Sequence, residues 1–173
     1  MRAIGIAVLV SLSMLTACQQ PKTEFIHVGP NWAAVNELKP SDKTFDVTVR
    51  GKQSYAVGDE VELKVTSKEA GQLWIVRVDP NDEVGLIYPN DFVESNDIAA
   101  NKAMAIPGED ANWSIAASEP AGQSVVAVIV TTGNTDLRDV FDQKGSMRKA
   151  LQIVEAAPSW GLSKHVIDVT GEQ

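Results

Sequence analysis

A run of apolar residues at positions 123–131 places the strongest constraint on the fold. Its centre reads Val-Val-Ala-Val-Ile-Val, and β-branched side chains of this kind favour strands over helices. The run has no polar face, which is typical of a strand that is buried on both sides. Residues 73–78 show the same pattern. We therefore predict two central strands in the core of a sheet.

Other apolar segments alternate with polar residues at a period of two. Residues 45–49 and 61–65 follow this pattern, as expected for strands with one buried face. The sequence Asp79-Pro80-Asn81-Asp82 is typical of a turn, and residues 84–88 are expected to return from it as a hairpin partner. Shorter strands are expected at residues 103–106, 113–117 and 165–169.

Two segments before the last predicted strand have helical spacing instead. The first follows the capping candidate Thr135, and the second lies between Ser146 and Pro158. Their apolar residues recur three and four positions apart: Leu137, Val140 and Phe141, then Met147, Ala150, Leu151 and Val154. The sequence therefore predicts a mainly β fold, an immunoglobulin-like antiparallel β-sandwich with one or two short helices before the last strand.

The first 18 residues have the pattern of a bacterial lipoprotein signal peptide. One cation, Arg2, precedes an apolar stretch at residues 3–15, and the segment ends in Leu15-Thr16-Ala17-Cys18. The stretch is shorter than the roughly 20 residues that span a bilayer, so it indicates a processing segment. We expect residues 1–17 to be removed and Cys18 to be lipidated. Gln19 rather than an aspartate follows, which by bacterial sorting rules favours the outer membrane, on its periplasmic face.

Residues 18–43 are predicted to form a tether, and residues 44–173 a single domain. The tether contains Pro21, Pro30 and Pro40, which favour extended backbone around them. It also contains apolar residues that a plain spacer does not need, and residues 32–38 are compatible with a short helix. This helix either docks on its own domain, which we favour, or presents Trp32 to a partner.

Charge and cysteine content exclude several classes of function. The net charge of −8 disfavours binding to nucleic acid, which requires clustered lysine and arginine. Cys18 is the single cysteine, so its lipidation leaves no disulfide, catalytic thiolate or cysteine-based metal site. No cofactor is expected.

Candidate catalytic and metal-binding residues are few. The two histidines, His27 and His165, are far apart in the sequence, and no Gly-x-Ser-x-Gly motif is present. The oxygen-rich segment with Asp79, Asp82 and Glu83 is a weak calcium candidate. It does not have the spacing of an EF-hand, and a hairpin turn stabilised by aspartate side chains explains it better.

Five short motifs resemble those of a bacterial family that is described as a domain of unknown function, number four-three-eight-four. The family recurs in lipoproteins and beside signalling or protease modules. The resemblance covers about residues 54–132 and implies a fold without an established chemistry. The motifs are Val57-Gly58-Asp59, the segment 71–79, Tyr88-Pro89-Asn90, Ile106-Pro107-Gly108 and Pro120-Ala121-Gly122. Most of these residues suit turns, so we interpret them as a turn scaffold.

Two functions remain compatible with the sequence. The first is a non-enzymatic binding or assembly module of the cell envelope, with secretion machines as one such assembly, that contacts a protein partner. Its expected contact residues are Asp91, Phe92 and Glu94, with Trp32 next. Alternatively, Phe92 and Ile98 only pin this loop to the sandwich. The alternative is a hydrolase of envelope polymers that uses carboxylates in the loops between residues 88 and 110.

Overall fold

The computed structural model describes residues 28–93, 95–141 and 145–171. The helices and strands follow in the order α1 (Pro30–Glu37), β1 (Val47–Arg50), β2 (Ser54–Ala56), β3 (Leu63–Ser67), β4 (Gly71–Val78), β5 (Val84–Tyr88), β6 (Asp97–Ile98), β7 (Ala103–Ile106), β8 (Gly122–Thr131), α2 (Arg138–Phe141), α3 (Met147–Ala156) and β9 (Trp160–Thr170).

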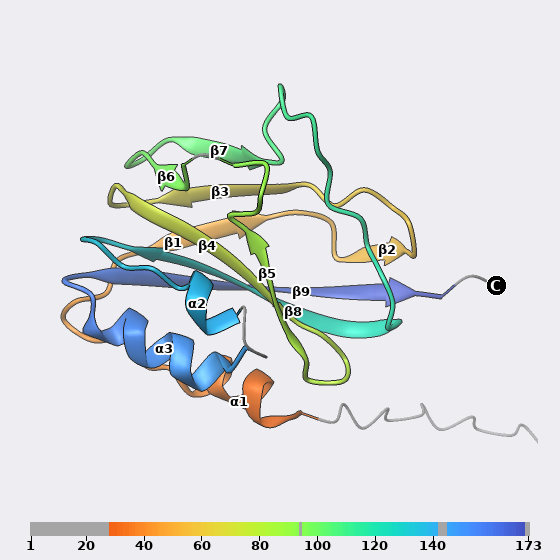
Figure 1. The fold of residues 1–173 in the computed structure, drawn as a ribbon, viewed down its shortest axis with the longest axis horizontal. Helices are drawn as coiled ribbons and strands as arrows, with labels where there is room; N and C mark the ends of the chain where they lie inside the picture. The colour runs from red at the N-terminus through yellow and green to blue at the C-terminus, as the bar shows by residue number, and fades with distance from the viewer. Residues whose placement is uncertain (1–27, 94, 142–144, 172–173) are drawn as a thin grey trace, which may run out of the picture.

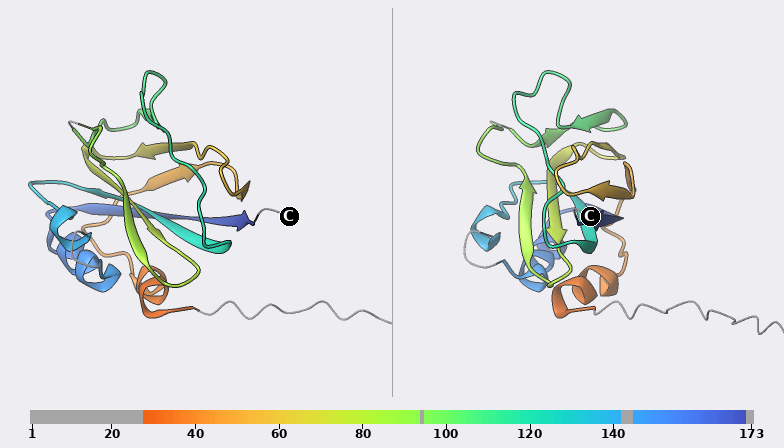
Figure 2. Two further views of the ribbon diagram at one scale, coloured as in Figure 1. Left: turned by 45° about the vertical axis from the view of Figure 1, so that its right-hand side comes forward. Right: turned by 90° about the vertical axis from the view of Figure 1, so that its right-hand side faces the viewer.

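These elements form two packed sheets and a helical layer. The small sheet has the order β1-β3-β7, and the large sheet has the order β2-β9-β8-β4-β5, with β6 paired to β4. Paired strands are antiparallel except β2, which runs parallel to β9. The small sheet covers one side of the large sheet, and α1 and α3 lie on the other side (Figures 1 and 2). The mainly β sandwich with short helices before the last strand is therefore confirmed.

Strand β8 lies at the centre of the large sheet and is buried on both faces. One set of its side chains packs between the two sheets, and the other set packs toward the helices. The first set is Val126, Val128 and Val130, and the second is Val125, Ala127 and Ile129. Strand β4, which pairs with β8 over seven residues, is buried in the same way. Both central strands are thus confirmed. Their sequences have no polar face because each strand packs against one core on either side.

Two strand predictions need correction, and two short strands are additional. Residues 113–117 form no named strand, because their pairing with residues 58–61 is limited to a bridge between Ala116 and Glu60 and an adjacent bond from Gly58 N to the carbonyl of Ala117. Strand β9 begins at Trp160, before the predicted start at residue 165. Its first half includes Gly161, where a Cβ atom would lie 2.5 Å from a Val47 methyl group. This close packing favours glycine, and the glycine interrupts the alternation of apolar and polar residues along the strand. The short strands β2 and β6 were not predicted.

Helix α1 packs onto the domain, as the favoured interpretation of residues 32–38 predicts. Asp82, in the β4–β5 hairpin, accepts hydrogen bonds from the backbone N–H groups of Asn31 and Trp32, each at 2.9 Å. These groups lack partners within the helix, and a carboxylate at this end also complements the helix dipole. Asn31 Oδ1 accepts a bond from Met147 N at 3.0 Å. The start of α1 is therefore joined to both the hairpin and α3.

Among the residues that the structure describes, no helix is long and apolar enough to cross a membrane.

Candidate binding surface

The loop after β5 exposes a large aromatic side chain. Phe92 is 67% exposed, and Asp91 beside it is also exposed. The loop backbone is fixed around Asn90, whose Oδ1 accepts a bond from Phe92 N at 3.1 Å and whose carbonyl accepts one from Val93 N at 3.0 Å. We call residues 88–93 the Phe92 loop. Glu94, the third predicted contact residue, lies outside the described residues.

The base of the Phe92 loop is held by Tyr88 and Trp113. Their rings stack with centroids 6.3 Å apart and planes at 27°. Tyr88 is buried, and its hydroxyl donates to the carbonyl of Ser95 at 3.3 Å. Burial raises the pKa of Tyr88, and the charge of Asp97 raises it further. Because the base is anchored in this way, the loop presents Phe92 from a fixed position.

Trp113 also lines an open groove of about 500 Å³, which we call the Trp113 groove. Its walls come from residues 60–64, the end of β1 and residues 105–115, and they combine apolar surface with charges of both signs. The charged side chains are Arg50, Glu60, Glu62, Lys64 and Glu109.

A second hollow adjoins this groove, because Glu60 and Glu62 line both. It has a volume of about 530 Å³, and Gly51, Lys52, Tyr55 and Asp59 complete its lining. We call it the Tyr55 cleft. The Phe92 loop, the Trp113 groove and the Tyr55 cleft are thus linked through shared or stacked residues. Together they form a surface with an aromatic end and an acidic end.

The aspartates of the weak calcium candidate are used in the turn between β4 and β5. Asp79 Oδ1 accepts bonds from the backbone N–H groups of Asn81 and Glu83, at 2.9 and 2.8 Å. The carboxylate of Asp82 binds the start of α1, and the side chain of Glu83 is exposed. Within the described ranges, no group of three or more histidine, aspartate or glutamate side chains is arranged to hold a metal ion.

Replacing Asp82 with alanine is therefore expected to lower the free energy of unfolding by about 1–2 kcal/mol, the usual effect of removing a helix cap. Glu83→Ala in the same turn is the control, and its effect should stay within about 0.5 kcal/mol because the side chain is exposed. Urea denaturation of both variants measures the difference. Equal losses would contradict the capping role, and a calcium-dependent stabilisation that Asp82→Ala abolishes would favour a calcium site instead.

The two other predicted site residues, Trp32 and Cys18, do not belong to this surface as the structure describes it. Trp32 is only 9% exposed and packs in the core between the large sheet and the helices, so it offers little surface to a partner. Cys18 lies outside the described residues, as does His27. His165 is largely buried, and its Nε2 atom lies 2.8 Å from the carbonyl oxygen of Lys52, at hydrogen-bond distance.

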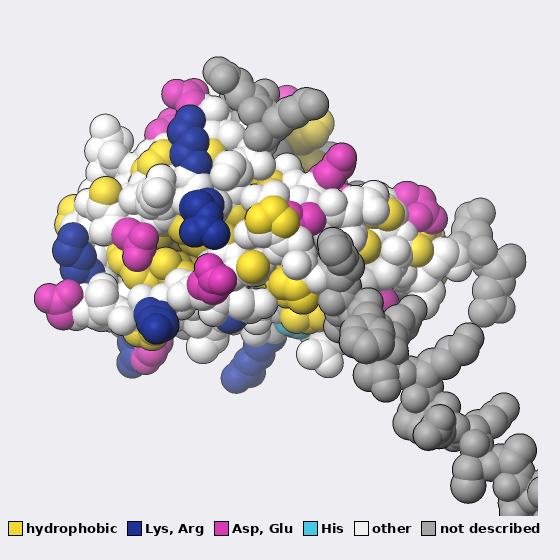
Figure 3. Space-filling model, turned by 90° about the horizontal axis from the view of Figure 1, so that it is seen from below, with side chains coloured by type: hydrophobic (Ala, Val, Ile, Leu, Met, Phe, Trp, Pro, Cys, Tyr) yellow, Lys and Arg dark blue, Asp and Glu magenta, His cyan; other side chains and the backbone are white. Residues whose placement is uncertain are grey.

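The helical layer has a hollow of its own, between α1 and α3. It measures about 390 Å³ and combines Leu38 and Leu151 with charged residues at its rim. Arg148 and Glu37 approach to 3.9 Å there, but both are largely exposed, so their attraction is weak. Figure 3 shows this face, with hydrophobic side chains gathered on its left-hand part and single charged side chains around them.

Arg77 ties together two of the motif segments. Its Nη2 atom donates to the carbonyl of Pro120 at 3.5 Å. On either side of that motif, Nε donates to Ser124 Oγ at 3.1 Å and Nη1 donates to Ser118 Oγ at 2.9 Å. Burial lowers the pKa of Arg77, and the charge of Asp79 opposes that shift. These contacts hold the segment before β8 against β4, in agreement with the turn-scaffold interpretation.

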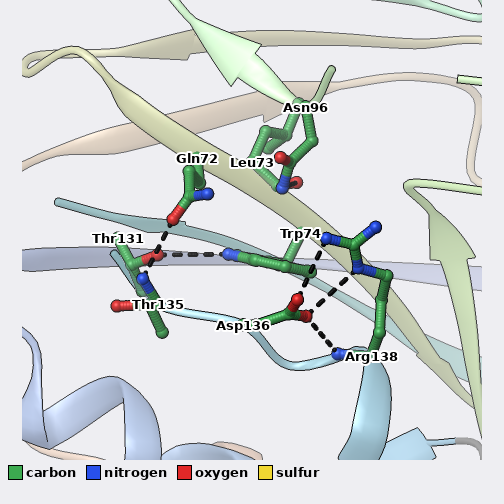
Figure 4. Close-up of polar contacts among 8 residues, drawn as sticks. All are labelled: Gln72, Leu73, Trp74, Asn96, Thr131, Thr135, Asp136 and Arg138. Carbon is green, nitrogen blue, oxygen red and sulfur yellow. Dashed lines mark hydrogen bonds and ion pairs between the residues drawn. The ribbon is translucent and has the colours of Figure 1, made fainter. Parts of the chain in front are cut away.

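A polar cluster where β4 begins and β8 ends has a similar structural role (Figure 4). Trp74 Nε1 donates to Thr131 Oγ1 at 3.1 Å, and Thr135 N donates to Gln72 Oε1 at 3.1 Å. Asn96 Nδ2 donates to a main-chain carbonyl of β4 at 3.0 Å. The bonds attach the flanking loops to the sheet, so we assign this cluster to the fold.

Sequence reasoning missed Tyr55 and Trp113 as candidate site residues. Tyr55 stands just before Val57-Gly58-Asp59, and acidic residues alternate with apolar ones after it. That alternation is typical of an ordinary strand and does not single out Tyr55. The pattern of residues 113–117 predicts a strand, whereas Trp113 lies in a loop beside Tyr88.

Comparison with known proteins gives a match to one family over part of the chain. No curated protein matches the chain. Residues 54–134 match the model of a family described as "Domain of unknown function (DUF4384)". This range agrees with the expected 54–132 and includes Tyr55, the Phe92 loop and Trp113. The part of the chain from β2 through the end of β8 is therefore similar to the DUF4384 family.

Proposed function

We propose that this protein is a lipid-anchored binding module of the cell envelope that contacts a protein partner through the Phe92 loop and has no enzymatic role. The exposed Phe92 on its fixed loop is the observation that carries the proposal. The Leu15-Thr16-Ala17-Cys18 sequence supports the anchor, and Gln19 supports the outer membrane facing the periplasm.

The exposed side chain of Phe92 can contribute free energy to binding. Burying a phenylalanine contributes about 1.5–3 kcal/mol, yet the loop holds Phe92 in water. Its backbone bonds to Asn90 reduce the conformational entropy that a partner would otherwise have to remove. Aromatic residues are enriched at the centres of protein interfaces. A rigid loop with an exposed aromatic tip therefore has the properties of an interface anchor.

The rest of the surface agrees with a protein ligand. The Trp113 groove and the Tyr55 cleft add acidic residues beside the aromatic ones, and the whole chain is acidic. Complementary charge speeds association and selects partners, so a partner with a basic and partly apolar surface fits best.

The hydrolase alternative retains one supporting observation. Of the carboxylates expected between residues 88 and 110, the Trp113 groove places Glu109 beside an aromatic ring, and Glu60 and Glu62, from outside that range, line the same groove. Paired carboxylates near a groove occur in glycosidases. Release of soluble fragments from isolated cell-wall polymer by the purified protein, lost in Glu60→Gln or Glu62→Gln, would favour this alternative over the binding module.

The binding proposal is tested by replacing Asp91, Phe92 and Glu94 together with alanine. We expect the melting temperature to stay nearly unchanged, because Asp91 and Phe92 are exposed and the backbone bonds of the loop remain. Recovery of the co-purifying protein with the lipidated chain from membranes should fall strongly. Val166→Ala, which removes a 41% exposed side chain from β9, is the matched control and should retain the partner.

Two outcomes would contradict the proposal. A large loss of thermal stability in the triple variant would show that the loop is structural. Unchanged recovery of the partner would place the interface on another surface.

A further inference from the structure

The loop between β7 and β8 carries the sequence Asn112-Trp113-Ser114. Asparagine followed two positions later by serine or threonine, with a residue other than proline between them, is the acceptor pattern for N-linked glycans. The pattern occurs once in the chain. Such a short pattern also arises by chance, so its place in the structure decides whether a modifying enzyme can use it.

The side chains of Asn112 and Ser114 lie together on the outer side of the loop. Exposure alternates here, because Asn112 and Ser114 are exposed, whereas Trp113 and Ile115 are half-buried and pack against the core between the two sheets. Alternate side chains of extended backbone lie on opposite sides, and the ring of Trp113 stacks on Tyr88. The acceptor amide and the hydroxyl are therefore presented to solvent on one side.

The backbone of residues 112–114 lies between two anchoring hydrogen bonds. Ala111 N donates to the carbonyl of Gly108 at 3.0 Å, and Val61 N donates to the carbonyl of Ile115 at 2.8 Å. Within the part of the chain that the structure describes, residues 112–114 themselves make no hydrogen bond. A modifying enzyme must draw the acceptor into its own site, which costs least where no helix or strand has to open. The loop is thus held at both ends and accessible between them.

Two exposed carboxylates, those of Glu109 and Asp110, precede the asparagine. Neither takes part in an ion pair among the described residues. Opposite charges orient partners at an interface, so an enzyme with a cationic group beside its acceptor site would bind this flank. Asp110, two positions before Asn112, is the nearer of the two in sequence.

We propose that Asn112 is the acceptor of an N-linked oligosaccharide, which a transferase outside the cytoplasmic membrane moves from a polyprenyl-diphosphate carrier. Asn112 Nδ2 forms a bond to C1 of the first sugar, and the bond between C1 and the diphosphate oxygen breaks. The carrier diphosphate leaves with the bonding electrons, and Nδ2 loses one proton to a base of the transferase. Ser114 supplies a recognition contact through its hydroxyl. The inference goes beyond the proposed binding function and uses only the export that the leader predicts.

The test is peptide mapping of the lipidated protein, purified from its native membranes. Trypsin releases Asn112 in the peptide of residues 103–138, because Lys102 and Arg138 bound a stretch without lysine or arginine. We expect this peptide to carry a mass increment made of sugar residues, and electron-transfer fragmentation to locate it on Asn112. Asn134, which is exposed in the same peptide but lacks the pattern, is the internal control and should be unmodified.

Four variants assign the modification to the named groups. Asn112→Gln and Ser114→Ala should each abolish the increment, and Ser114→Thr should retain it, because threonine supplies the same hydroxyl. Asp110→Asn should lower the modified fraction of the peptide several-fold. All three positions are exposed, so the melting temperatures should stay close to that of the wild type.

The inference is overturned if the peptide is unmodified in the wild-type protein, if the increment lies on another residue, or if Ser114→Ala retains it. An unchanged modified fraction in Asp110→Asn would overturn the role of the acidic flank. The same digest reports the lipid on Cys18 separately, and the mapping needs no partner. Its failure is therefore distinct from failure of the anchor or of the Phe92 loop.

Discussion

Replacing Val128 with aspartate is expected to leave most of the protein unfolded. Val128 is fully buried between the two sheets and lies opposite Ile75 of β4 and Ser163 of β9. An aspartate there is buried without a partner, and such changes destabilise by about 4 kcal/mol or more. Since natural domains have about 5–15 kcal/mol of stability, the loss is a large part of the total. Circular dichroism with urea denaturation measures it.

Val125→Asp, on the opposite face of β8, is expected to cause a comparable loss. Val125 packs in the core toward the helices, so a scan along β8 should show no period of two. Val166→Asp in the neighbouring strand is the control, because that side chain is 41% exposed, and its effect should be small. A period of three to four along residues 123–131 would contradict the strand, and tolerance of aspartate at position 125 would contradict burial under the helices.

The second large effect concerns the membrane anchor. Under the proposed lipidation of Cys18, Cys18→Ser removes the thiol that accepts the diacylglycerol. Lipid chains on one residue contribute about 0.8 kcal/mol per buried methylene, so their loss should change the distribution of the protein almost completely. We expect the variant to leave the membrane fraction, as uncleaved precursor or as soluble protein.

Membrane fractionation and labelling with a radioactive fatty acid test this expectation. Ser13→Ala, in the same leader but away from the processing site, is the control and should be labelled like the wild type. Labelling of the Cys18→Ser variant at the wild-type level would contradict lipidation at this residue.

The fold was predictable where local sequence and burial agree. The runs at residues 73–78 and 123–131 identified β4 and β8, because a strand that is buried on both faces carries mostly apolar side chains on both. Ser146 and the helical spacing after it identified α3, whose cap is seen in the bond from Lys149 N to Ser146 Oγ. The first half of β9 was missed because Gly161 and Ser163 interrupt the alternation, and its pairing with β8 is set by long-range contacts.

The candidate surface was predictable only in part, for a similar reason. Phe92 was a candidate because the segment after residue 88 is long for a connection within a domain and combines apolar with acidic residues. The positions of Trp113 beside Tyr88 and of Tyr55 beside the acidic residues of its cleft depend on how distant segments meet, and spacing along the chain does not reveal either. The role of Asp82 at the start of α1 likewise joins residues that are far apart in sequence.

Photo-cross-linking in intact cells tests the central claim most directly. A benzoylphenylalanine residue is introduced at position 92, and at position 166 as the control, in the otherwise unchanged lipidated protein. We predict a discrete cross-linked product with one protein for position 92 and none for position 166. Absence of a product at position 92, with the protein folded and anchored, or the same product from both positions would contradict a binding role for the Phe92 loop.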